Sequence, residues 1–195
     1  MKIIDINDPG VVENAVKVLR AGGVVMHPTE TCYGLAVDIF NKNALGKVYE
    51  VKQMSLDKPV SILASSLGMA QKYGDFSKKA LGLVGKYWPG PLSIVVPRSK
   101  FLPDFLNPNE KFVSIRFSDL SFCTEMVRSL GHPVTTTSAN RTGEPQLYEA
   151  SGGGLIGVDL VVDGGRIEKN KPSTIVKVDG EEISILRQGD VDVRI

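Results

Sequence analysis

The sequence has few of the residues that build metal sites and disulfide frameworks. Among 195 residues it contains two cysteines, Cys32 and Cys123, and two histidines, His27 and His132. Neither pair has the spacing of a metal-ligand motif, and two cysteines do not make a disulfide framework. We therefore expect no metal held by the chain itself, and a reducing compartment.

Long apolar runs and an excess of one charge are missing as well. No apolar run approaches the ~18 residues of a membrane-spanning helix, and the opening MKIIDINDPG does not resemble a secretion signal. Lys and Arg number 23, Asp and Glu 22, and the net charge of +1 gives no general attraction to nucleic acid or acidic membranes. We expect a cytoplasmic protein with no membrane partner, in which a local basic cavity is still allowed.

Three common catalytic motifs are also missing. The chain has no G-x-x-x-x-G-K-[ST] phosphate loop, no G-x-G-x-x-G after a strand pattern and no G-x-S-x-G nucleophile elbow. A catalytic Ser-His-acid triad would have to use His27 or His132. Each precedes a proline, a restricted position that more often serves a turn.

Helical and strand patterns alternate along the chain, which predicts an α/β fold. Helical spacing occurs at residues 12–19, 44–49, 77–87 and 122–130. Strand patterns occur at 2–6, 24–26, 60–64, 92–96, 112–117, 134–138, 158–162, 173–178 and 183–187. Helices join some neighbouring strands and Asp179-Gly180 predicts a hairpin between the last two, so the sheet should be mixed. The length suits one domain.

A polar segment follows the predicted strand 24–26. The residues directly behind this apolar run are Thr29, Glu30, Thr31, Cys32, Tyr33 and Gly34. Polar residues at the end of a core strand form either a ligand-binding loop or an ordinary turn.

Two further strands carry polar residues on one face. In KFVSIRF, Phe112, Ser114 and Arg116 share a face by period two, opposite a face that looks like core. This pattern places Arg116 outside the core. In PVTTTSAN, Thr136 and Ser138 also share a face. Taken alone, each pattern fits a solvated strand face or an edge strand as well as it fits a binding site.

Cations stand at three more element ends. Arg187 follows Leu186 in a predicted strand, and Lys52 and Lys58 bracket the loop after a predicted helix. Arg and Lys neutralise phosphate, and open α/β sheets commonly bind ligands at strand ends. Together the hydroxyls and cations indicate a cavity for a phosphate-bearing ligand and a small polar one.

Seven segments resemble the YrdC/TsaC family and occur in its order. They are HPTETCYGLAVD, KPVSIL, WPGPLSIVV, VSIRF, TTTSANRTGEP, STIV and ILRQGD. The resemblance runs from about Gly22 to Asp190 and is to the single-domain form. It implies one YrdC-like domain over residues 1–195, an open twisted mixed sheet curved around a positively charged cavity.

Members of that family are threonylcarbamoyl-adenylate synthases. The resemblance implies that L-threonine and bicarbonate form a carbamate, which attacks the α-phosphate of ATP and displaces pyrophosphate. Mg²⁺ would accompany the ATP. The product would pass to a partner transferase complex that modifies tRNA, and direct binding of RNA in the same cavity is compatible with this assignment.

The resemblance also implies roles for single residues. Threonine contacts are implied for Thr31, Arg116, Thr136 and Ser173. ATP contacts are implied for Lys58, Ser138, Asn140 and Arg187. Lys52 and Arg116 would be catalytic, and Tyr33-Gly34 would let the chain turn closely around the amino-acid site.

Two positions depart from the family pattern. The family motif K-x-R reads Lys52-Gln53-Met54 here, and Leu63 stands where some members have a polar residue. Lys52 or Arg141 would supply part of the missing charge if its side chain reaches, so we expect an active but slow enzyme that Met54→Arg speeds. If Met54 instead fills a gap against the second helix, arginine there would only destabilise the fold. Two alternatives remain: a non-catalytic paralogue that binds nucleotide or structured RNA, and carbamoyl transfer as in a domain of hydrogenase maturation proteins.

Overall fold

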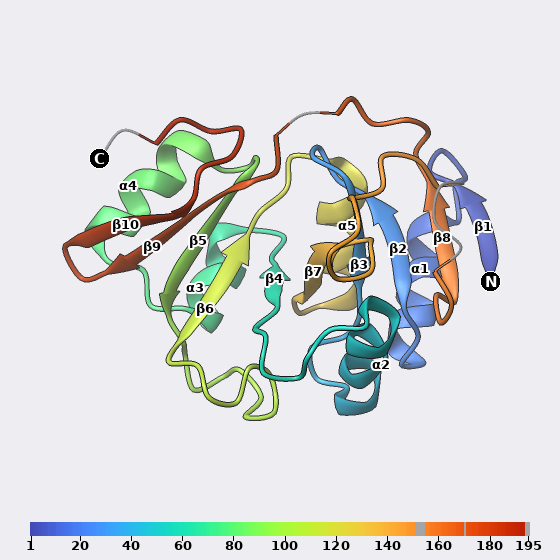
Figure 1. Cartoon of the computed structure of the whole chain (residues 1–195), viewed down its shortest axis with the longest axis horizontal. Coiled ribbons are helices and arrows are strands. Elements are labelled where there is room, and N and C mark those ends of the chain that lie inside the picture. Colours follow the sequence, from blue (N-terminus) through green and yellow to red (C-terminus); the bar gives the residue numbers. More distant parts are fainter. Residues whose placement is uncertain (151–154, 170, 194–195) are drawn as a thin grey trace.

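A computed structural model describes residues 1–150, 155–169 and 171–193 of the chain, and the glycine run 152–154 lies outside them (Figure 1). Within this part, ten strands form one sheet in the order β1-β8-β2-β3-β7-β4-β6-β5-β9-β10. The strands are β1 Lys2–Asp5, β2 Val25–Pro28, β3 Tyr33–Ala36, β4 Ser61–Leu63, β5 Leu92–Pro97, β6 Phe112–Arg116, β7 Val134–Ser138, β8 Leu160–Asp163, β9 Thr174–Asp179 and β10 Glu182–Arg187. The helices are α1 Val11–Arg20, α2 Lys42–Lys52, α3 Leu67–Tyr73, α4 Lys78–Tyr87 and α5 Ser121–Leu130.

The sheet is mixed, as the sequence predicts. β1 and β2 pair with β8 in parallel, as do β4 with β6 and β5 with β9. The remaining neighbours are antiparallel, including the predicted β9-β10 hairpin, where Gly180 has a φ of +60° that favours glycine. None of the described helices is long and apolar enough to cross a membrane.

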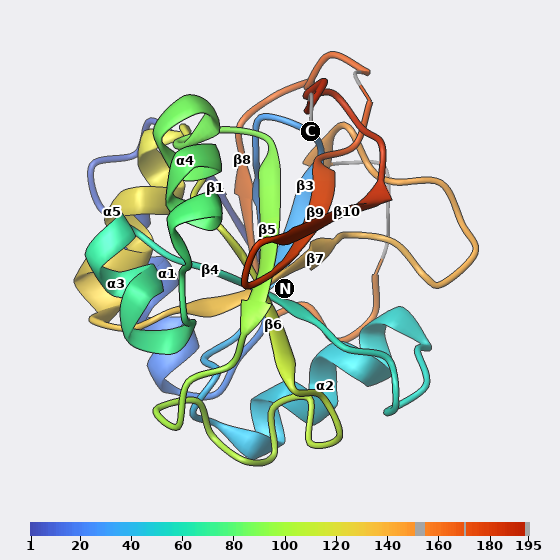
Figure 2. The ribbon, with the colours of Figure 1, turned by 90° about the vertical axis from the view of Figure 1, so that its left-hand side faces the viewer.

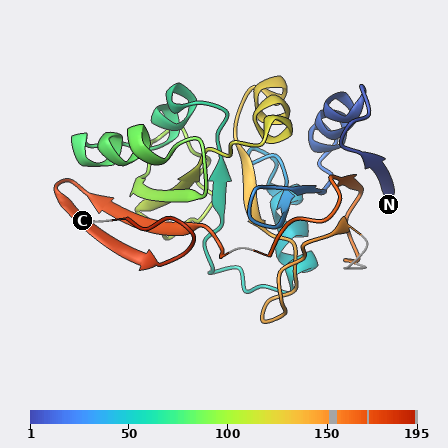
Figure 3. The same cartoon turned by 90° about the horizontal axis from the view of Figure 1, so that it is seen from above.

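Helices lie on both sides of the sheet. Seen from above, α1, α3, α4 and α5 lie on one side and α2 lies on the other (Figure 3). The side view separates the same two groups (Figure 2).

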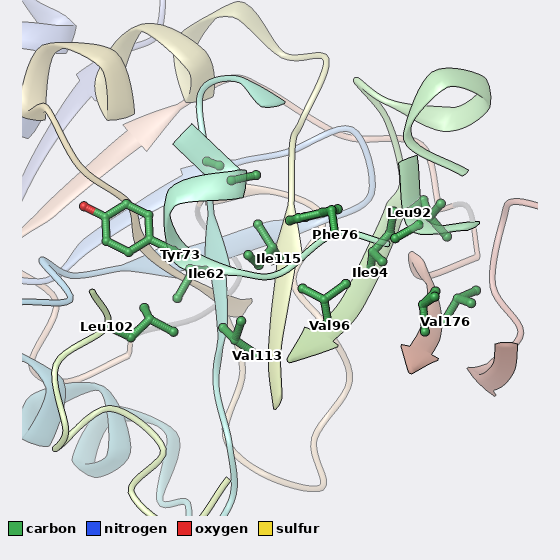
Figure 4. Close-up of a cluster of buried hydrophobic side chains, with 14 of the residues drawn as sticks. Ile62, Tyr73, Phe76, Leu92, Ile94, Val96, Leu102, Val113, Ile115 and Val176 are labelled. Carbon is green, nitrogen blue, oxygen red and sulfur yellow. The ribbon is translucent and has the colours of Figure 1, made fainter. Parts of the chain in front are cut away.

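The apolar core is divided into three clusters. The largest packs Ile62, Ile94 and Ile115 of the central strands against α3 and α4 (Figure 4). A second cluster joins α1 and α5 to one face of β2, β7 and β8, and a third packs α2 on β2 and β3. These clusters fix the central strands, whose polar faces remain for the site.

Helix ends agree with the sequence where a side chain caps them. Asn41 accepts a hydrogen bond from the Ala44 N–H at 3.0 Å and starts α2. Gly131 ends α5 with a φ of +93°. The first helix starts later than Asp8-Pro9 suggests, because Asp8 accepts from the Gly10 N–H at 2.7 Å and holds a turn before Val11.

Three elements differ from what the sequence patterns predict. β3 starts at Tyr33, so Tyr33-Gly34 begins a strand instead of making the expected turn. The strand β2 continues through His27 and Pro28, and His27 is fully buried in the sheet. The helix α3, capped by Ser66, was not predicted.

Candidate functional site

The floor of the site is a row of side chains across the middle of the sheet. Gly34 of β3 lies opposite His27 of β2 on one side and Ser138 of β7 on the other. Thr136, two residues before Ser138, lies opposite Ser61 of β4. Directly opposed residues, and residues two apart on a strand, share a face.

The row continues onto β6. The hydroxyl of Ser61 donates to that of Ser114 at 2.8 Å, and Arg116 follows two residues later on the same face. Six polar positions from four separate parts of the sequence are thereby aligned, which explains why no single segment revealed them.

A cavity of about 150 Å³ lies over this floor. Six residues expected from the sequence line it: Thr31, Arg116, Thr136, Ser138, Ser173 and Arg187. Others complete the lining without having been expected as contacts, among them Thr29, Cys32, Ser61, Ser93, Thr137 and Gln146. The cavity therefore collects hydroxyls, two guanidinium groups and one buried thiol.

Arg116 is held by a buried ion pair. Its Nη2 lies 2.8 Å from Glu30 Oε1 and donates to Thr31 Oγ1 at 3.2 Å. Ser118 donates to the other oxygen of Glu30 at 2.5 Å. Arg116 is only 6% exposed, so the expectation that it lies outside the core is wrong: the pairing with Glu30 makes its burial possible. The Nε of Arg116 is buried and has no partner among the described residues.

Arg187 supplies the second guanidinium. Its Nε donates to the Ser173 carbonyl at 3.0 Å and its Nη2 to the Ser173 hydroxyl at 2.9 Å. Burial lowers its pKa, and the nearby charge of Arg116 lowers it further. Two neighbouring cations, one of them paired with Glu30, leave a site suited to anions; the net sign of the cavity's charge stays a prediction.

Lys52 lies beside the cavity, outside its described lining. From the end of α2 its Nζ donates to Ser138 O at 2.5 Å and to the carbonyl and side-chain oxygens of Asn140, each at 3.1 Å. Burial lowers the pKa of Lys52 to about 8. An ammonium has three protons, and these contacts use all three. Lys52 therefore fastens the segment after β7 to α2.

Asn140 and Lys58 are also outside the described lining. The side chain of Asn140 accepts from the Ser138 hydroxyl at 2.6 Å, which orients a hydroxyl that does line the cavity. Lys58 is exposed, while its neighbour Pro59 lines the cavity. The expected ATP contact of Lys58 therefore has no support in the geometry.

Met54, which stands at the position of the family's arginine, packs in the core and does not line the cavity. Met54 is partly buried and packs against the largest apolar cluster. Arg141, one candidate for the missing charge, pairs with Glu144 at 3.7 Å and lines a different hollow beside α2. Neither Arg141 nor Lys52 replaces a cation at the cavity wall.

A second, more apolar cavity of about 310 Å³ adjoins the first. The two share Pro59, Val60, Ser61 and Ile175. In the second, the ammonium of Lys177 lies 3.8 Å from the centre of the Phe112 ring. A ligand larger than a free amino acid can extend from one cavity into the other.

The described residues offer little for a bound metal. No three His, Cys, Asp or Glu side chains gather among them as metal ligands do. Glu30, which lies between the lining residues Thr29 and Thr31 in the chain, is committed to Arg116 and Ser118.

Comparison with known proteins decides the family. The Sua5/YciO/YrdC family model, described as telomere recombination, matches residues 17–189. This chain belongs to that family. A Vibrio campbellii member named threonylcarbamoyl-AMP synthase is 31% identical over 186 residues, covering 91% of this chain and 98% of its own.

Solved structures of family members share the fold. Sua5 of P. abyssi, crystallised with L-threonine, superposes with a TM-score of 0.90 at 25% identity over 97% of this chain. This chain spans 58% of that longer protein. E. coli YciO superposes with a TM-score of 0.87 at 23% identity, over 99% of this chain and 97% of its own.

The functional residue that sequence analysis missed is Glu30. It stands in the polar segment after β2, yet no role was assigned to it. A carboxylate next to Thr31 and a lone arginine on the strand face of Ser114 could have suggested the pair, because buried charges are paired.

Proposed function

We propose that this chain is a threonylcarbamoyl-AMP synthase that joins L-threonine, bicarbonate and ATP and releases pyrophosphate. The observation that carries the proposal is the cavity: six residues implied by the family resemblance converge on it from five different elements and loops. The wider class is nucleotidyl transfer, and the alternative of a hydrogenase-type carbamoyl transferase has no separate observation in its favour.

The polar cavity suits the amino acid. A guanidinium is a favourable partner for a carboxylate, and Arg116 lines the cavity with its Nη2 held in place by Glu30 and Thr31. Thr31, Thr136 and Ser173 add hydroxyls around a volume of about 150 Å³, a size that suits a small molecule. Threonine bound there would present its amino group for carbamate formation.

The nucleotide would lie across both cavities. Arg187 and Ser138 line the first cavity at positions where phosphate oxygens can be bound, and the adjoining apolar cavity accepts a flat, weakly polar group. The reaction needs the carbamate oxygen in line with the α-phosphate, so positioning and charge stabilisation are the main requirements. Mg²⁺ would enter with the triphosphate; none of the described residues is assigned to it.

The non-catalytic paralogue stays as a second candidate because Met54 carries no charge. The two candidates differ in one experiment: pyrophosphate release from MgATP, with threonine and bicarbonate each supplied or withheld. A synthase releases pyrophosphate only when both are present. A binding paralogue releases none under any condition. Delivery to a tRNA-modifying transferase, direct RNA binding and the cytoplasmic location remain predictions.

A further inference from the structure

Ser93 has an unpaired hydroxyl at the wall of the cavity. It is the only polar residue of β5, whose sequence is LSIVVP, and it lines the cavity although it is only 4% exposed. None of the described residues makes a hydrogen bond with the Ser93 hydroxyl. Its oxygen is also not one of the partnerless side-chain atoms that are closed off from solvent. The hydroxyl therefore opens into the cavity, where a ligand can reach it.

In the sheet, Ser93 lies between the positions of two arginines. It lies directly opposite Arg116 of β6 on one side and Ile175 of β9 on the other, and Ile175 lies opposite Arg187 of β10. Directly opposed residues of an antiparallel pair share a face, with Cβ atoms about 4.5–5.5 Å apart. The polar floor of the cavity therefore continues from Arg116 onto β5, and Ser93 is its last polar position before the apolar side chain of Ile175.

Beside Arg116, the hydroxyl is placed to donate to an anion. A guanidinium group has only donors, so it cannot accept the Ser93 proton. A ligand ammonium would be repelled by the two arginines, whereas a carboxylate drawn to Arg116 brings an acceptor within reach of Ser93. A hydrogen bond to a charged acceptor is also stronger than one between neutral groups. The position of Ser93 therefore favours a ligand that carries a carboxylate.

We propose that Ser93 is a further substrate-binding residue, whose hydroxyl donates a hydrogen bond to the carboxylate of the amino-acid substrate beside Arg116. The inference rests on the proposed function, since it names a contact within the threonine site. It gives a role to the one hydroxyl in the apolar segment LSIVV, a residue that the sequence patterns left without a function.

The test is calorimetry of L-threonine with wild-type protein and Ser93→Ala, beside their melting temperatures. Alanine removes only the hydroxyl, and we expect threonine affinity to fall about tenfold. The melting temperature should not fall, because no protein group loses a hydrogen-bond partner. A serine with a merely structural role would give the reverse result, a lower melting temperature with unchanged affinity, and that result overturns the inference.

Ser65→Ala is the matched control. Ser65 is 5% exposed, and its hydroxyl donates to the Met69 sulfur at 3.6 Å, outside the described lining of the cavity. Its replacement should leave threonine affinity unchanged. Affinity lost equally in Ser65→Ala and Ser93→Ala would show that any small loss of packing weakens the site, and would contradict a direct contact at Ser93.

Three further ligands identify the group that Ser93 contacts. L-2-aminobutyrate lacks only the side-chain hydroxyl, so Ser93→Ala should weaken it by the same factor as threonine. L-threoninamide has a neutral amide in place of the carboxylate, so it should be weakened less. A lost preference for threonine over 2-aminobutyrate would place Ser93 at the substrate hydroxyl, and weakening of MgATP alone would place it at the phosphates. Either result overturns the carboxylate contact, as does equal weakening of threonine and threoninamide.

The outcome for the wild type separates the inference from the proposed function. Equal threonine binding by wild type and Ser93→Ala overturns the inference and leaves the proposed function intact. No threonine binding by the wild type contradicts the proposed function, and the inference with it.

Discussion

At the scale of single residues, the Glu30–Arg116 pair has both a structural and a binding role. Arg116→Met would leave the Glu30 carboxylate buried without its counter-charge, and we expect a loss of about 3–5 kcal/mol in unfolding free energy. Adding Glu30→Gln should restore most of that stability, because no buried charge is left. Threonine affinity should stay low in the double variant. Denaturant unfolding and calorimetry on both variants check this, and a double variant that binds threonine normally would remove Arg116 from the site.

His27 predicts how stability depends on pH. Its pKa is about 4 in the folded protein, below its ordinary 6.5, because burial disfavours the charged ring. The unfolded chain therefore binds more protons between these values, so stability is full above about pH 6.5 and is lost as pH falls toward 4. The loss should be about 3 kcal/mol. His27→Phe should lack this part of the acid dependence in unfolding experiments; identical acid profiles would show that His27 does not titrate this way.

Met54 should act through packing. Because its side chain contacts the largest apolar cluster, Met54→Arg should lower the melting temperature without speeding pyrophosphate release. This replaces the sequence-based expectation of a faster variant. The measurement is the threonine-dependent rate beside the melting temperature. A faster enzyme with unchanged melting would show that a cation at this position reaches the phosphates.

At the scale of elements, Lys52 links the end of α2 to the segment after β7. Lys52→Met removes three hydrogen bonds but keeps those that Thr142 donates to the Lys52 carbonyl. We expect backbone amides of residues 138–142 to exchange hydrogen several-fold faster, and ATP to bind more weakly.

Lys47→Met is the control for that experiment. Lys47 is on the same helix, but its Nζ donates to the Gly22 carbonyl at 2.7 Å, away from the cavity. Its variant should leave exchange at 138–142 unchanged. Equal exchange in wild type and Lys52→Met would contradict the anchoring role.

Elements whose ends are set by a capping or turn residue nearby in the chain were predictable from the sequence. Asn41 and Ser77 cap their helices, and Asp179-Gly180 turns the last hairpin. β3 was not, because its four residues are all buried and show no alternation. α3 has seven residues including Gly68, too few for a helical period to stand out.

At the scale of the whole molecule, the site is a product of sheet order. β7 lies between β3 and β4, so residues near positions 34, 61 and 136 meet although they are far apart in the chain. Periodicity gave the face of each strand but not its neighbours, and the family resemblance supplied the set of converging residues. The resemblance could not give the direction of the Lys52 and Lys58 side chains, because that direction depends on where α2 ends.

The central claim is that this cavity makes threonylcarbamoyl-AMP, and labelled bicarbonate tests it most directly. Wild-type protein would be incubated with MgATP, L-threonine and ¹³C-bicarbonate, and the nucleotides analysed by mass spectrometry. The account predicts a threonylcarbamoyl-adenylate that carries the label in its carbamoyl carbon, and much less of it from the Arg116→Met, Glu30→Gln double variant. Bound ATP and threonine with no labelled adenylate would contradict the synthase assignment and favour the binding paralogue.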